Sequence, residues 1–353
     1  MTNHEQSLQA FDLLKELVAI PSVSCEETHA ADRLEKYIRS HSLHYLRKGN
    51  NIACIPLAFN PDKPTILLNA HIDTVKPVNG WKRNPFTPIV EDNRLYGLGS
   101  NDCGGGLVAL LMVYLQLHST AQAYNLIFLA SCEEEISGKN GIECILPDLP
   151  PITLGLVGEP TGMQPAIAEK GLMVLDVTTR GKAGHAARNE GVNAIYEALP
   201  DIEWFRTYHF PEESPLLGPV KMSVTQINAG TQHNVVPDTC TFVVDIRSNE
   251  FYNNEELFKI ITSHIRGEVH ARSFRLNSSR IDPGHPIIRR AEALKKQPFG
   301  SPTLSDQALM PFPSFKMGPG QSSRSHTADE YITFKEIEEA ISIYLQLLDG
   351  LRL

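Results

Sequence analysis

Three short apolar segments in this chain of 353 residues each end in side chains that bind metals or transfer protons. Runs of this length, bounded by glycine and proline, are typical of strands buried on both faces of a parallel sheet. Functional groups of open α/β sheets gather beyond the carboxyl ends of the strands, so we expect these side chains to meet at one sheet edge. The segments and the residues that follow them are 65–70 with His71 and Asp73, 125–131 with Glu133 and Glu134, and 154–158 with Glu159.

The other elements of the first 171 residues support an α/β fold. Apolar residues at helical spacing predict amphipathic or buried helices, and Ser24 with Glu27 resembles a capping box at the start of the second helix. Helices that alternate with strands imply a parallel sheet. The predicted helices are 5–19, a helix ending near residue 40, 104–118 and the C-terminal 334–348; further strands are predicted at 52–58 and 94–97.

The pattern changes after about residue 171 and changes back near residue 282. Strands and helices in mixed order between these points suggest an antiparallel sheet with helices on it. We therefore predict a mostly parallel-sheet catalytic domain, residues 1–171 and 282–353, with a smaller inserted α+β domain, residues 172–281. The insert's predicted strands are 172–179, 221–228, 239–247 and 269–276, and its predicted helices are 191–206 and 255–266.

Composition excludes several classes of function. A net charge of −9 argues against nucleic acid as a partner, because phosphate binding needs clustered lysine and arginine. No apolar stretch approaches the roughly 20 residues that cross a bilayer, so no membrane partner is expected. Residues 1–20 lack the basic start and apolar core of a signal peptide, and we predict a cytoplasmic protein. The six cysteines form no C-x-x-C pair and are expected to be free thiols, with a catalytic role for Cys103 or Cys132 disfavoured.

The glycine-rich segment 96–106 could be read in three ways. It resembles a dinucleotide-binding loop, but Asn101 and Asp102 stand where the third glycine belongs, and an acid there would repel a pyrophosphate. No Gly-Lys-Ser/Thr follows, which excludes a nucleotide-binding P-loop. Asp102 lies just before the helix 104–118, so it is either an N-cap or a carboxylate that bridges two metals.

The acidic pair and the two histidines also have ordinary alternatives. Glu133 and Glu134 could be solvated surface acids, but after a strongly apolar strand one could bind a metal while the other acts as a general base. His71 could be a surface histidine beside a turn aspartate; otherwise Asp73 orients its ring. His326 lies in a loop before the last helix. The five potential ligands divide into two three-ligand sites that share one residue, each with a position open for water: His71, Asp102, Glu134, Glu159 and His326.

Taken in order, these motifs resemble the two-zinc amidohydrolases. The ordered set is His-x-Asp, Gly-x-Gly-x-x-Asp-x-x-Gly-Gly, Glu-Glu, Gly-Glu-Pro-Thr and a late histidine, and it spans nearly the whole chain. That family includes acetylornithine deacetylase, succinyl-diaminopimelate desuccinylase, aminoacylases, carboxypeptidases and dipeptidases. Gly318-Pro319-Gly320 and the segment 325–331 are most similar to the acetylornithine deacetylase branch.

The resemblance implies roles for individual residues. One zinc would be held by His71, Asp102 and Glu159, and the other by Asp102, Glu134 and His326; Co²⁺ or Mn²⁺ would also suit such ligands. Glu133 would be the general acid/base and Asp73 the residue that orients His71. A cis peptide bond between Asp102 and Cys103 is a common feature of the family. The insert would be a lid or dimerisation domain whose His185 steadies the oxyanion across a homodimer.

The resemblance also implies a small-molecule substrate, an N-acyl-amino acid. Asn234 and Arg247 align with lid positions that touch substrate, while Lys170 and Arg324 are either cations for a substrate carboxylate or solvated surface charges. Nα-acetyl-ornithine in arginine biosynthesis is the first candidate, and Arg324 near His326 makes Nα-succinyl-ornithine the alternative. Two departures from the family pattern are Gly104, where a lysine is frequent, and a rather short lid; neither removes a ligand.

Three other functions compete with this interpretation. A dipeptidase or aminopeptidase on the same scaffold differs only in substrate. A nucleotide-binding oxidoreductase would need the glycine turn to bind a cofactor, and the missing third glycine opposes it. A relative without activity, serving only to bind or scaffold, would have no need to retain every ligand and Glu133.

Overall fold

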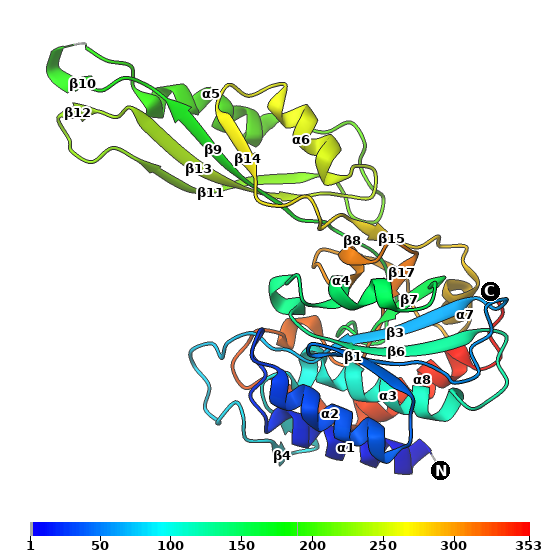
Figure 1. Cartoon of the computed structure of the whole chain (residues 1–353). Coiled ribbons are helices and arrows are strands. Elements are labelled where there is room, and N and C mark those ends of the chain that lie inside the picture. Colours follow the sequence, from blue (N-terminus) through cyan, green and yellow to red (C-terminus); the bar gives the residue numbers. More distant parts are fainter. Residues whose placement is uncertain (1–2, 189) are drawn as a thin grey trace. The chain divides into compact units, whose positions relative to one another are not determined.

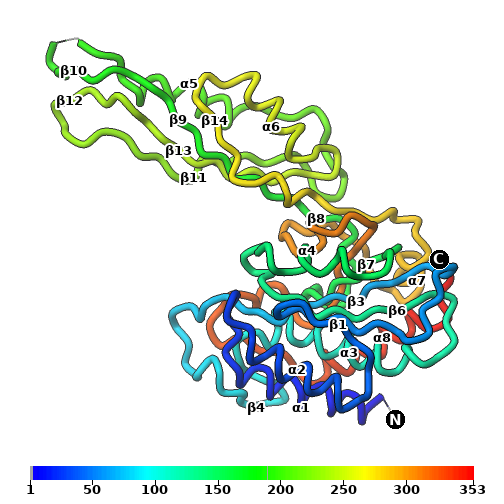
Figure 2. The backbone as a smooth tube through the Cα atoms, in the orientation of Figure 1, coloured from blue at the N-terminus to red at the C-terminus, as the bar shows by residue number. Residues whose placement is uncertain are grey.

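The computed structural model describes residues 3–188 and 190–353, which form two compact units. Unit 1 comprises the chain up to Ile167 together with Arg280–Phe299 and Ser305–Leu353. Unit 2 comprises Ala168–Ser279 and Gly300–Leu304 and is drawn mostly in green to yellow in Figures 1 and 2. The role predicted for residues 172–281, a lid or dimerisation domain, stays a prediction.

A mostly parallel sheet forms the centre of unit 1, which confirms the predicted α/β fold. Its strand order is β1-β2-β6-β3-β7-β17-β8-β15, with β16 paired to β8. The pairs β3–β6, β3–β7 and β7–β17 are parallel, whereas β1, β2 and β8 join antiparallel. The strands are β1 (Tyr45–Lys48), β2 (Asn51–Cys54), β3 (Thr65–His71), β6 (Asn125–Ser131), β7 (Leu154–Val157), β8 (Ala166–Glu169), β15 (Ser279–Arg280), β16 (Phe299–Ser301) and β17 (Ser314–Lys316).

The register of the parallel strands brings their carboxyl ends together. His71 at the end of β3 pairs with Ser131 at the end of β6, and Asn69 pairs with Val157 at the end of β7. Every residue of β3 and β6 is buried, as expected for strands covered on both faces. Residues that follow these strands therefore start from one edge of the sheet.

Helices cover one face of this sheet and bury the larger of its two cores (Figure 1). The central helix α3 (Gly105–Leu117) contacts β3, β6 and the two terminal helices, α1 (Asn3–Val18) and α8 (Phe334–Leu348). It is buried nearly all round, as its uniformly apolar sequence predicts. A smaller core on the other face includes the short helix α4 (Ile142–Ile145). Elsewhere in unit 1 lie α7 (Pro286–Ala293) and the small sheet of β4 (Ile89–Glu91), β5 (Arg94–Tyr96) and β18 (Tyr331–Thr333).

The capping box predicted at Ser24 and Glu27 does not form. Helix α2 (Thr28–Ser40) has Glu27 as its N-cap residue, but the Glu27 side chain makes no capping hydrogen bond. Instead the Ser24 hydroxyl donates to Asp73 Oδ2 at 2.7 Å, and Glu27 accepts backbone N–H groups of Cys25 and Glu133. Both side chains are drawn away from the helix by partners that are distant in sequence.

Unit 2 is an antiparallel sheet with helices packed on it. Its strand order is β11-β13-β9-β14, and the alternating burial of β9 shows that one face is packed. A core of buried apolar residues joins this face to helix α5 (Ala194–Thr207) and helix α6 (Asn254–Thr262). The strands are β9 (Met173–Arg180), β11 (Lys221–Ala229), β13 (Thr239–Arg247) and β14 (Glu268–Ala271), with a separate pair β10 (Gly184–His185) and β12 (Val235–Val236).

Five strands of the central sheet, β1, β8, β15, β16 and β17, were not predicted, and some predicted elements differ at their ends. The predicted strand 52–58 stops at Cys54, and the predicted strand 269–276 stops at Ala271. The six cysteines are all free, as expected. Among the described residues, no helix is both long enough and apolar enough to span a membrane.

Candidate metal centre

Asp102 lies between two histidines and presents one carboxylate oxygen to each. Its Oδ1 is 3.3 Å from His71 Nε2, and its Oδ2 is 3.6 Å from His326 Nε2. A carboxylate in this position can bridge two metal ions, each of which also takes a histidine nitrogen. The family resemblance implies the same three residues as ligands, and their binding of metal stays a prediction.

The first set of candidate ligands consists of His71, Asp102 and Glu159. Glu159 follows β7, and its Oε1 lies 3.5 Å from His71 Nε2. That oxygen is buried and has no hydrogen-bond partner among residues 3–188 and 190–353, so a cation is the natural group to satisfy it. The parallel strands β3 and β7 thus bring His71 and Glu159 together.

The second set contains His326 and Asp102, but its glutamate is Glu135 instead of the predicted Glu134. Glu135 Oε2 is 2.9 Å from His326 Nε2, whereas Glu134 Oε2 lies 3.9 Å from His71 Nε2. One group of side chains with ligand atoms within 4.8 Å of one another is His71, Asp102 and Glu135. The partner expected for His326 is therefore displaced by one residue along the chain.

Glu133, predicted to be the general acid/base, directs its carboxylate elsewhere. The Asn140 side chain donates to its Oε1 at 2.9 Å, and the Asn140 backbone N–H donates to its Oε2 at 3.2 Å. Gly138 leaves the room for this, since a Cβ there would lie 2.0 Å from Glu133 Oε2. Glu133 also has a left-handed backbone with φ of 53°, so the chain leaves the strand conformation there. As a result Glu134 and Glu135, and not Glu133 and Glu134, lie near the two histidines.

The sequence contained one signal of this shift that the prediction did not use. Three acids, Glu133–Glu135, follow β6, and a pair could be chosen from them in two ways. Alternation along an ideal strand does not decide between the two, because the chain leaves the strand conformation at Glu133. Glu135 was missed for this reason.

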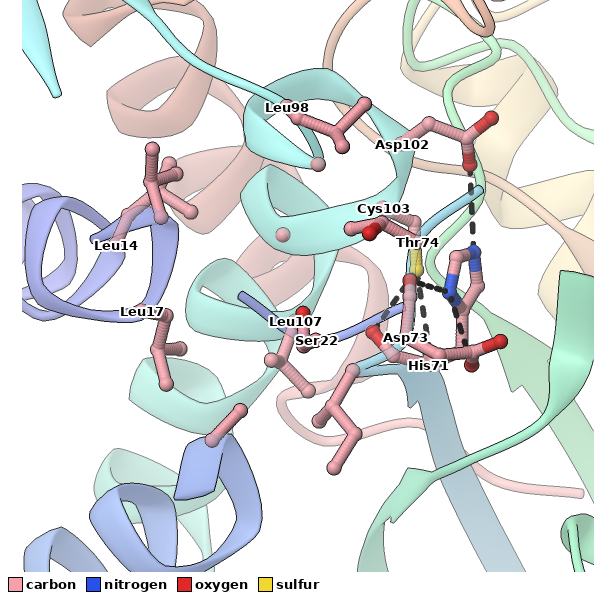
Figure 3. A pocket seen from close by; sticks show the side chains of 15 residues that line it. Leu14, Leu17, Ser22, His71, Asp73, Thr74, Leu98, Asp102, Cys103 and Leu107 are labelled. Carbon is pink, nitrogen blue, oxygen red and sulfur yellow. Dashed lines mark hydrogen bonds and ion pairs between the residues drawn. The ribbon is translucent and has the colours of Figure 1, made fainter. Parts of the chain in front are cut away.

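Asp73 lies against the His71 ring and also binds the acidic turn, and its predicted role of orienting His71 stays a prediction. His71 Nδ1 lies 2.8 Å from the Asp73 backbone oxygen and 3.5 Å from Asp73 Oδ1. Figure 3 shows Asp102 and Asp73 joined to different nitrogens of the His71 ring. The Asp73 carboxylate accepts the backbone N–H groups of Glu134 and Glu135 at 3.0 and 3.1 Å. A cavity of about 20 Å³ beside His71 and Asp102 has room for little more than a water molecule.

Glu330 shapes the loop that carries Asp102. It is buried and accepts the backbone N–H groups of Gly99, Asn101 and Asp102 at 3.1, 2.8 and 2.9 Å. The peptide bond between Asp102 and Cys103 is cis, as in the family that the sequence resembles. Sequence reasoning missed Glu330, although it follows Asp329 directly in the motif that contains His326.

The centre gathers more negative charge than the protein alone balances. Burial, and then the charge of Asp102, raises the pKa of Glu159 to about 8. Burial likewise raises the pKa of Glu134 well above its ordinary value. The hydrogen bond with Glu135 raises the pKa of His326 to about 9. Burial opposes the charged form of His71, but nearby Cys103, Glu134 and its carboxylate hydrogen bonds leave its pKa well above the ordinary value. Carboxylates crowded in this way favour divalent cations, and the His/Asp/Glu donor set fits them.

Cys103 does not look like a nucleophile. Its thiol is buried, accepts the backbone N–H of His71 at 3.2 Å, and has its pKa raised by burial. Its Sγ lies within 4.8 Å of the possible ligand atoms of His71 and Glu159. Since the thiolate is the reactive form, a raised pKa opposes reactivity.

The three predicted site residues of the insert, His185, Asn234 and Arg247, lie in unit 2. His185 ends β10, is exposed, and accepts the backbone N–H of Ala187 at its Nδ1. The Asn234 backbone oxygen accepts the N–H of Ala186 beside it. Arg247 at the end of β13 pairs with Asp245, with nitrogen–oxygen distances of 2.8 and 3.1 Å.

Two predicted substrate cations have partners within the protein. Lys170 in unit 2 donates to the Pro219 backbone oxygen at 2.8 Å, and burial, then the charges of Lys221 and Arg247, lower its pKa. Arg324 in unit 1 donates to both carboxylate oxygens of Glu336 at 3.0 Å and stacks over the ring of Tyr331. The charge of Arg324 is therefore already balanced by an acid.

The sequence pattern of Peptidase family M20/M25/M40 matches residues 67–350. The chain belongs to this family. The chain is 28% identical to an acetylornithine deacetylase of Pectobacterium carotovorum over 335 residues, which cover 86% of this chain and 83% of that protein. It is 23% identical to a succinyl-diaminopimelate desuccinylase of a Sulfurovum species, covering 80% of each chain. The resemblance seen in the sequence motifs is thereby confirmed.

Solved structures show the same fold along the whole chain. The aminopeptidase PepT of Bacillus cereus superposes with a TM-score of 0.77 at 19% identity, covering 97% of this chain and 98% of that one. A dinuclear metal binding peptidase of the M20 family from Bacillus subtilis superposes with a TM-score of 0.72 at 16% identity, covering 98% and 99% of the two chains. An M20 fold and membership of a hydrolytic, metal-binding family are thus shown for this chain.

Proposed function

We propose that this M20 enzyme hydrolyses the amide bond of an Nα-acyl-amino acid, with Nα-acetyl-ornithine as the first candidate substrate. The observation that carries the proposal is the Asp102 carboxylate, which faces His71 with one oxygen and His326 with the other. A carboxylate in this position suits a pair of metal ions. Ligands of this kind bind zinc and leave a coordination position open for water. Acetyl-ornithine hydrolysis would place the enzyme in arginine biosynthesis in the cytoplasm.

We assign the ligands from the positions of the side chains. His71, Asp102 and Glu159 would hold one ion, and His326, Asp102 and Glu135 the other. Zinc is the first choice, and Co²⁺ or Mn²⁺ would also suit these ligands. When bound, the two ions would lower the pKa of water and polarise the acyl carbonyl. Glu135 replaces Glu134 in this assignment because it is the acid that lies against His326.

Glu134 is then the general base. It belongs to neither ligand set, yet its carboxylate lies 3.9 Å from His71 Nε2, beside the shared bridge. From there Glu134 takes a proton from the attacking water and returns it to the departing amine. Glu133 cannot do this without leaving the Asn140 groups that bind both of its oxygens.

For unit 2 we propose the roles that the family resemblance implies. His185 is exposed and could donate a hydrogen bond to the developing oxyanion, with Asn234 adjacent to it. We propose Lys170 for the carboxylate of an amino acid, since Lys221 and Arg247 add positive charge near it, although Asp245 balances the charge of Arg247. A homodimer through unit 2 is supported by strand β11, which lies at the end of its sheet, and by exposed apolar Tyr196, Leu199 and Ile227.

Two alternatives concern the substrate. The succinyl alternative relied on Arg324, and the pairing of Arg324 with Glu336 weakens that reason. A peptidase activity is favoured by the structural neighbours, because an aminopeptidase and a tripeptidase superpose over 97% of the chain. The deacetylase is preferred because acetylornithine deacetylases recur among the relatives at 26–28% identity.

Release of free amine tests the proposal directly. Purified enzyme is incubated with Nα-acetyl-ornithine, Nα-succinyl-ornithine or a tripeptide, each with added zinc and with chelator. We expect zinc-dependent release from acetyl-ornithine, slowed about 10²- to 10⁴-fold in Glu134→Gln, which keeps the shape of the base. Release from the tripeptide alone would replace the deacylase with a peptidase, and chelator-resistant release would contradict the metal centre.

A further inference from the structure

We propose that Glu27 is a positioning residue that holds the backbone of the acidic turn Glu133–Glu135. In this position the turn directs Glu134 and Glu135 toward the metal centre. The catalytic consequence rests on the proposed function, whereas the structural consequence does not. Glu27 is far from this turn in sequence.

The Glu27 carboxylate is wholly buried, and both of its oxygens accept hydrogen bonds. Its Oε1 accepts the backbone N–H groups of Cys25 at 2.8 Å and Glu133 at 3.1 Å, and its Oε2 accepts the Asn50 side chain at 3.0 Å. Glu27 is the N-cap residue of α2, but its side chain does not cap the helix. Its hydrogen bonds therefore serve the turn and the loops beside it instead of the helix that it precedes.

Three consecutive backbone N–H groups of the turn are bound by two buried carboxylates. The first, from Glu133, donates to Glu27, and the next two, from Glu134 and Glu135, donate to Asp73 at 3.0 and 3.1 Å. Glu133 has the left-handed φ of 53°, which a non-glycine residue adopts only when its surroundings stabilise it. With the amides turned to one side, the side chains of Glu134 and Glu135 are free to face the histidines.

The segment 22–27 fixes both acceptors relative to each other. Ser24 donates its hydroxyl to Asp73 Oδ2 at 2.7 Å and its N–H to the Thr74 oxygen at 3.1 Å. The Thr74 N–H donates in turn to the Ser22 oxygen at 2.9 Å. A segment near the N-terminus thus lies along the end of β3 and presents Glu27 to the turn after β6.

Charge alone would disfavour an acid at this position. Three acids follow one another in the turn, and a fourth buried carboxylate beside them adds repulsion. What Glu27 offers is a pair of well-placed acceptor oxygens, and the side-chain oxygen of glutamine can replace one of them. The geometry therefore predicts that glutamine at position 27 keeps the turn in place, while alanine or the shorter aspartate releases it.

Hydrogen–deuterium exchange of the turn tests the structural part without any substrate. The full chain is loaded with zinc, and exchange of the amides 133–135 is followed in Glu27→Gln, Glu27→Asp and Glu27→Ala. Asn125→Ala is the matched control, since Asn125 is also buried and multiply hydrogen-bonded but lies at the opposite end of β6. We expect exchange at least tenfold faster in Glu27→Ala, faster in Glu27→Asp, and within threefold of the wild type in Glu27→Gln and Asn125→Ala.

Kinetics on the substrate identified above tests the catalytic part. We expect Glu27→Ala to lower kcat at least tenfold with KM within threefold and two metals retained, and Glu27→Gln to restore kcat to within threefold. The proposal would be overturned if Glu27→Ala and Glu27→Asp both showed the same turn exchange and the same kcat as Asn125→Ala. It would also be overturned if Glu27→Gln were as impaired as Glu27→Ala. If Glu27→Ala does not fold, the comparison of turn exchange and kcat between Glu27→Asp and Glu27→Gln decides whether the proposal holds. A wild-type protein inactive on every substrate would refute the proposed function and leave the exchange result to decide the role of Glu27.

Discussion

The two halves of the candidate metal centre are built in different ways. His71 comes from the end of a buried central strand, and its side chain is 1% exposed. His326 comes from a loop, has a left-handed backbone with φ of 58°, and its side chain is 52% exposed. Asp102 joins them with its two oxygens. One half is fixed by the strand ladder of the sheet, and the other depends on hydrogen bonds between loops.

The loop of His326 is held by the residue next to the shared aspartate. Asn101 accepts the Gln321 N–H at 2.9 Å and donates to the Gln321 oxygen at 3.1 Å. Glu330 binds three amides of the segment that carries Asp102. The exposed half is therefore connected to the buried half through the segment 99–102. Substitutions in the two halves should have effects of different size.

The largest effect is expected where the halves meet. Asp102→Ala removes a ligand from both sets, so we expect fewer than one zinc per chain and turnover lowered by roughly 10³-fold or more, since metal stabilisation of the transition state amounts to several kcal/mol. Metal analysis by mass spectrometry and initial rates check this. A variant that keeps two zinc ions per chain would show that Asp102 is not shared.

The second prediction separates the three acids of the turn. Glu134→Gln should keep two zinc ions and lower kcat by about 10²- to 10⁴-fold, the usual contribution of a general base. Glu133→Gln is the matched neighbour and should lower kcat less than tenfold, because Asn140 can still bind its amide. The reverse ranking, with Glu133→Gln the more damaging, would restore the assignment expected from sequence.

The sequence predicted the strand-based half better than the loop-based half. Apolar runs located β3, β6 and β7, and parallel pairing then placed His71 and Glu159 together because strand ends share an edge. The position of Glu135 could not be predicted, because it depends on the left-handed backbone of Glu133 and on the hydrogen bonds of Glu133 with Asn140 and Glu27. The expected capping box failed for the same reason: Ser24 and Glu27 have long-range partners that local pattern does not reveal.

A third prediction concerns the unequal burial of the histidines. His71→Ala should lower the melting temperature of the metal-free protein more than His326→Ala, since it leaves buried partners unsatisfied, a loss of about 1–3 kcal/mol. His326→Ala also removes a hydrogen bond, the one to Glu135, but water can reach its half-exposed ring and replace part of that contact, so we expect a loss of about 1 kcal/mol or less. Each variant should still lose one zinc. Equal melting temperatures for His71→Ala and His326→Ala in calorimetry would contradict the distinction between the strand-based half and the loop-based half of the centre.

The smallest effect is a dependence of zinc affinity on pH. In the metal-free protein the pKa of His326 is about 9, so at pH 7 its ring carries a proton that zinc must displace. As pH rises from 7 to 8, affinity at the site containing His326 should increase about tenfold, and the increase should level off above pH 9. Titration calorimetry in buffers of different ionisation enthalpy measures the released proton. Affinity that does not change with pH would contradict the hydrogen bond between His326 and Glu135 in the metal-free state.

Anomalous diffraction at the zinc edge from crystals of the loaded enzyme tests the two-site centre most directly. We predict two peaks on either side of Asp102. One should contact His71 and Glu159, and the other His326 and Glu135, with Glu134 bound to neither. A single peak, or a second peak bound by Glu134 while Glu135 points away, would contradict the account.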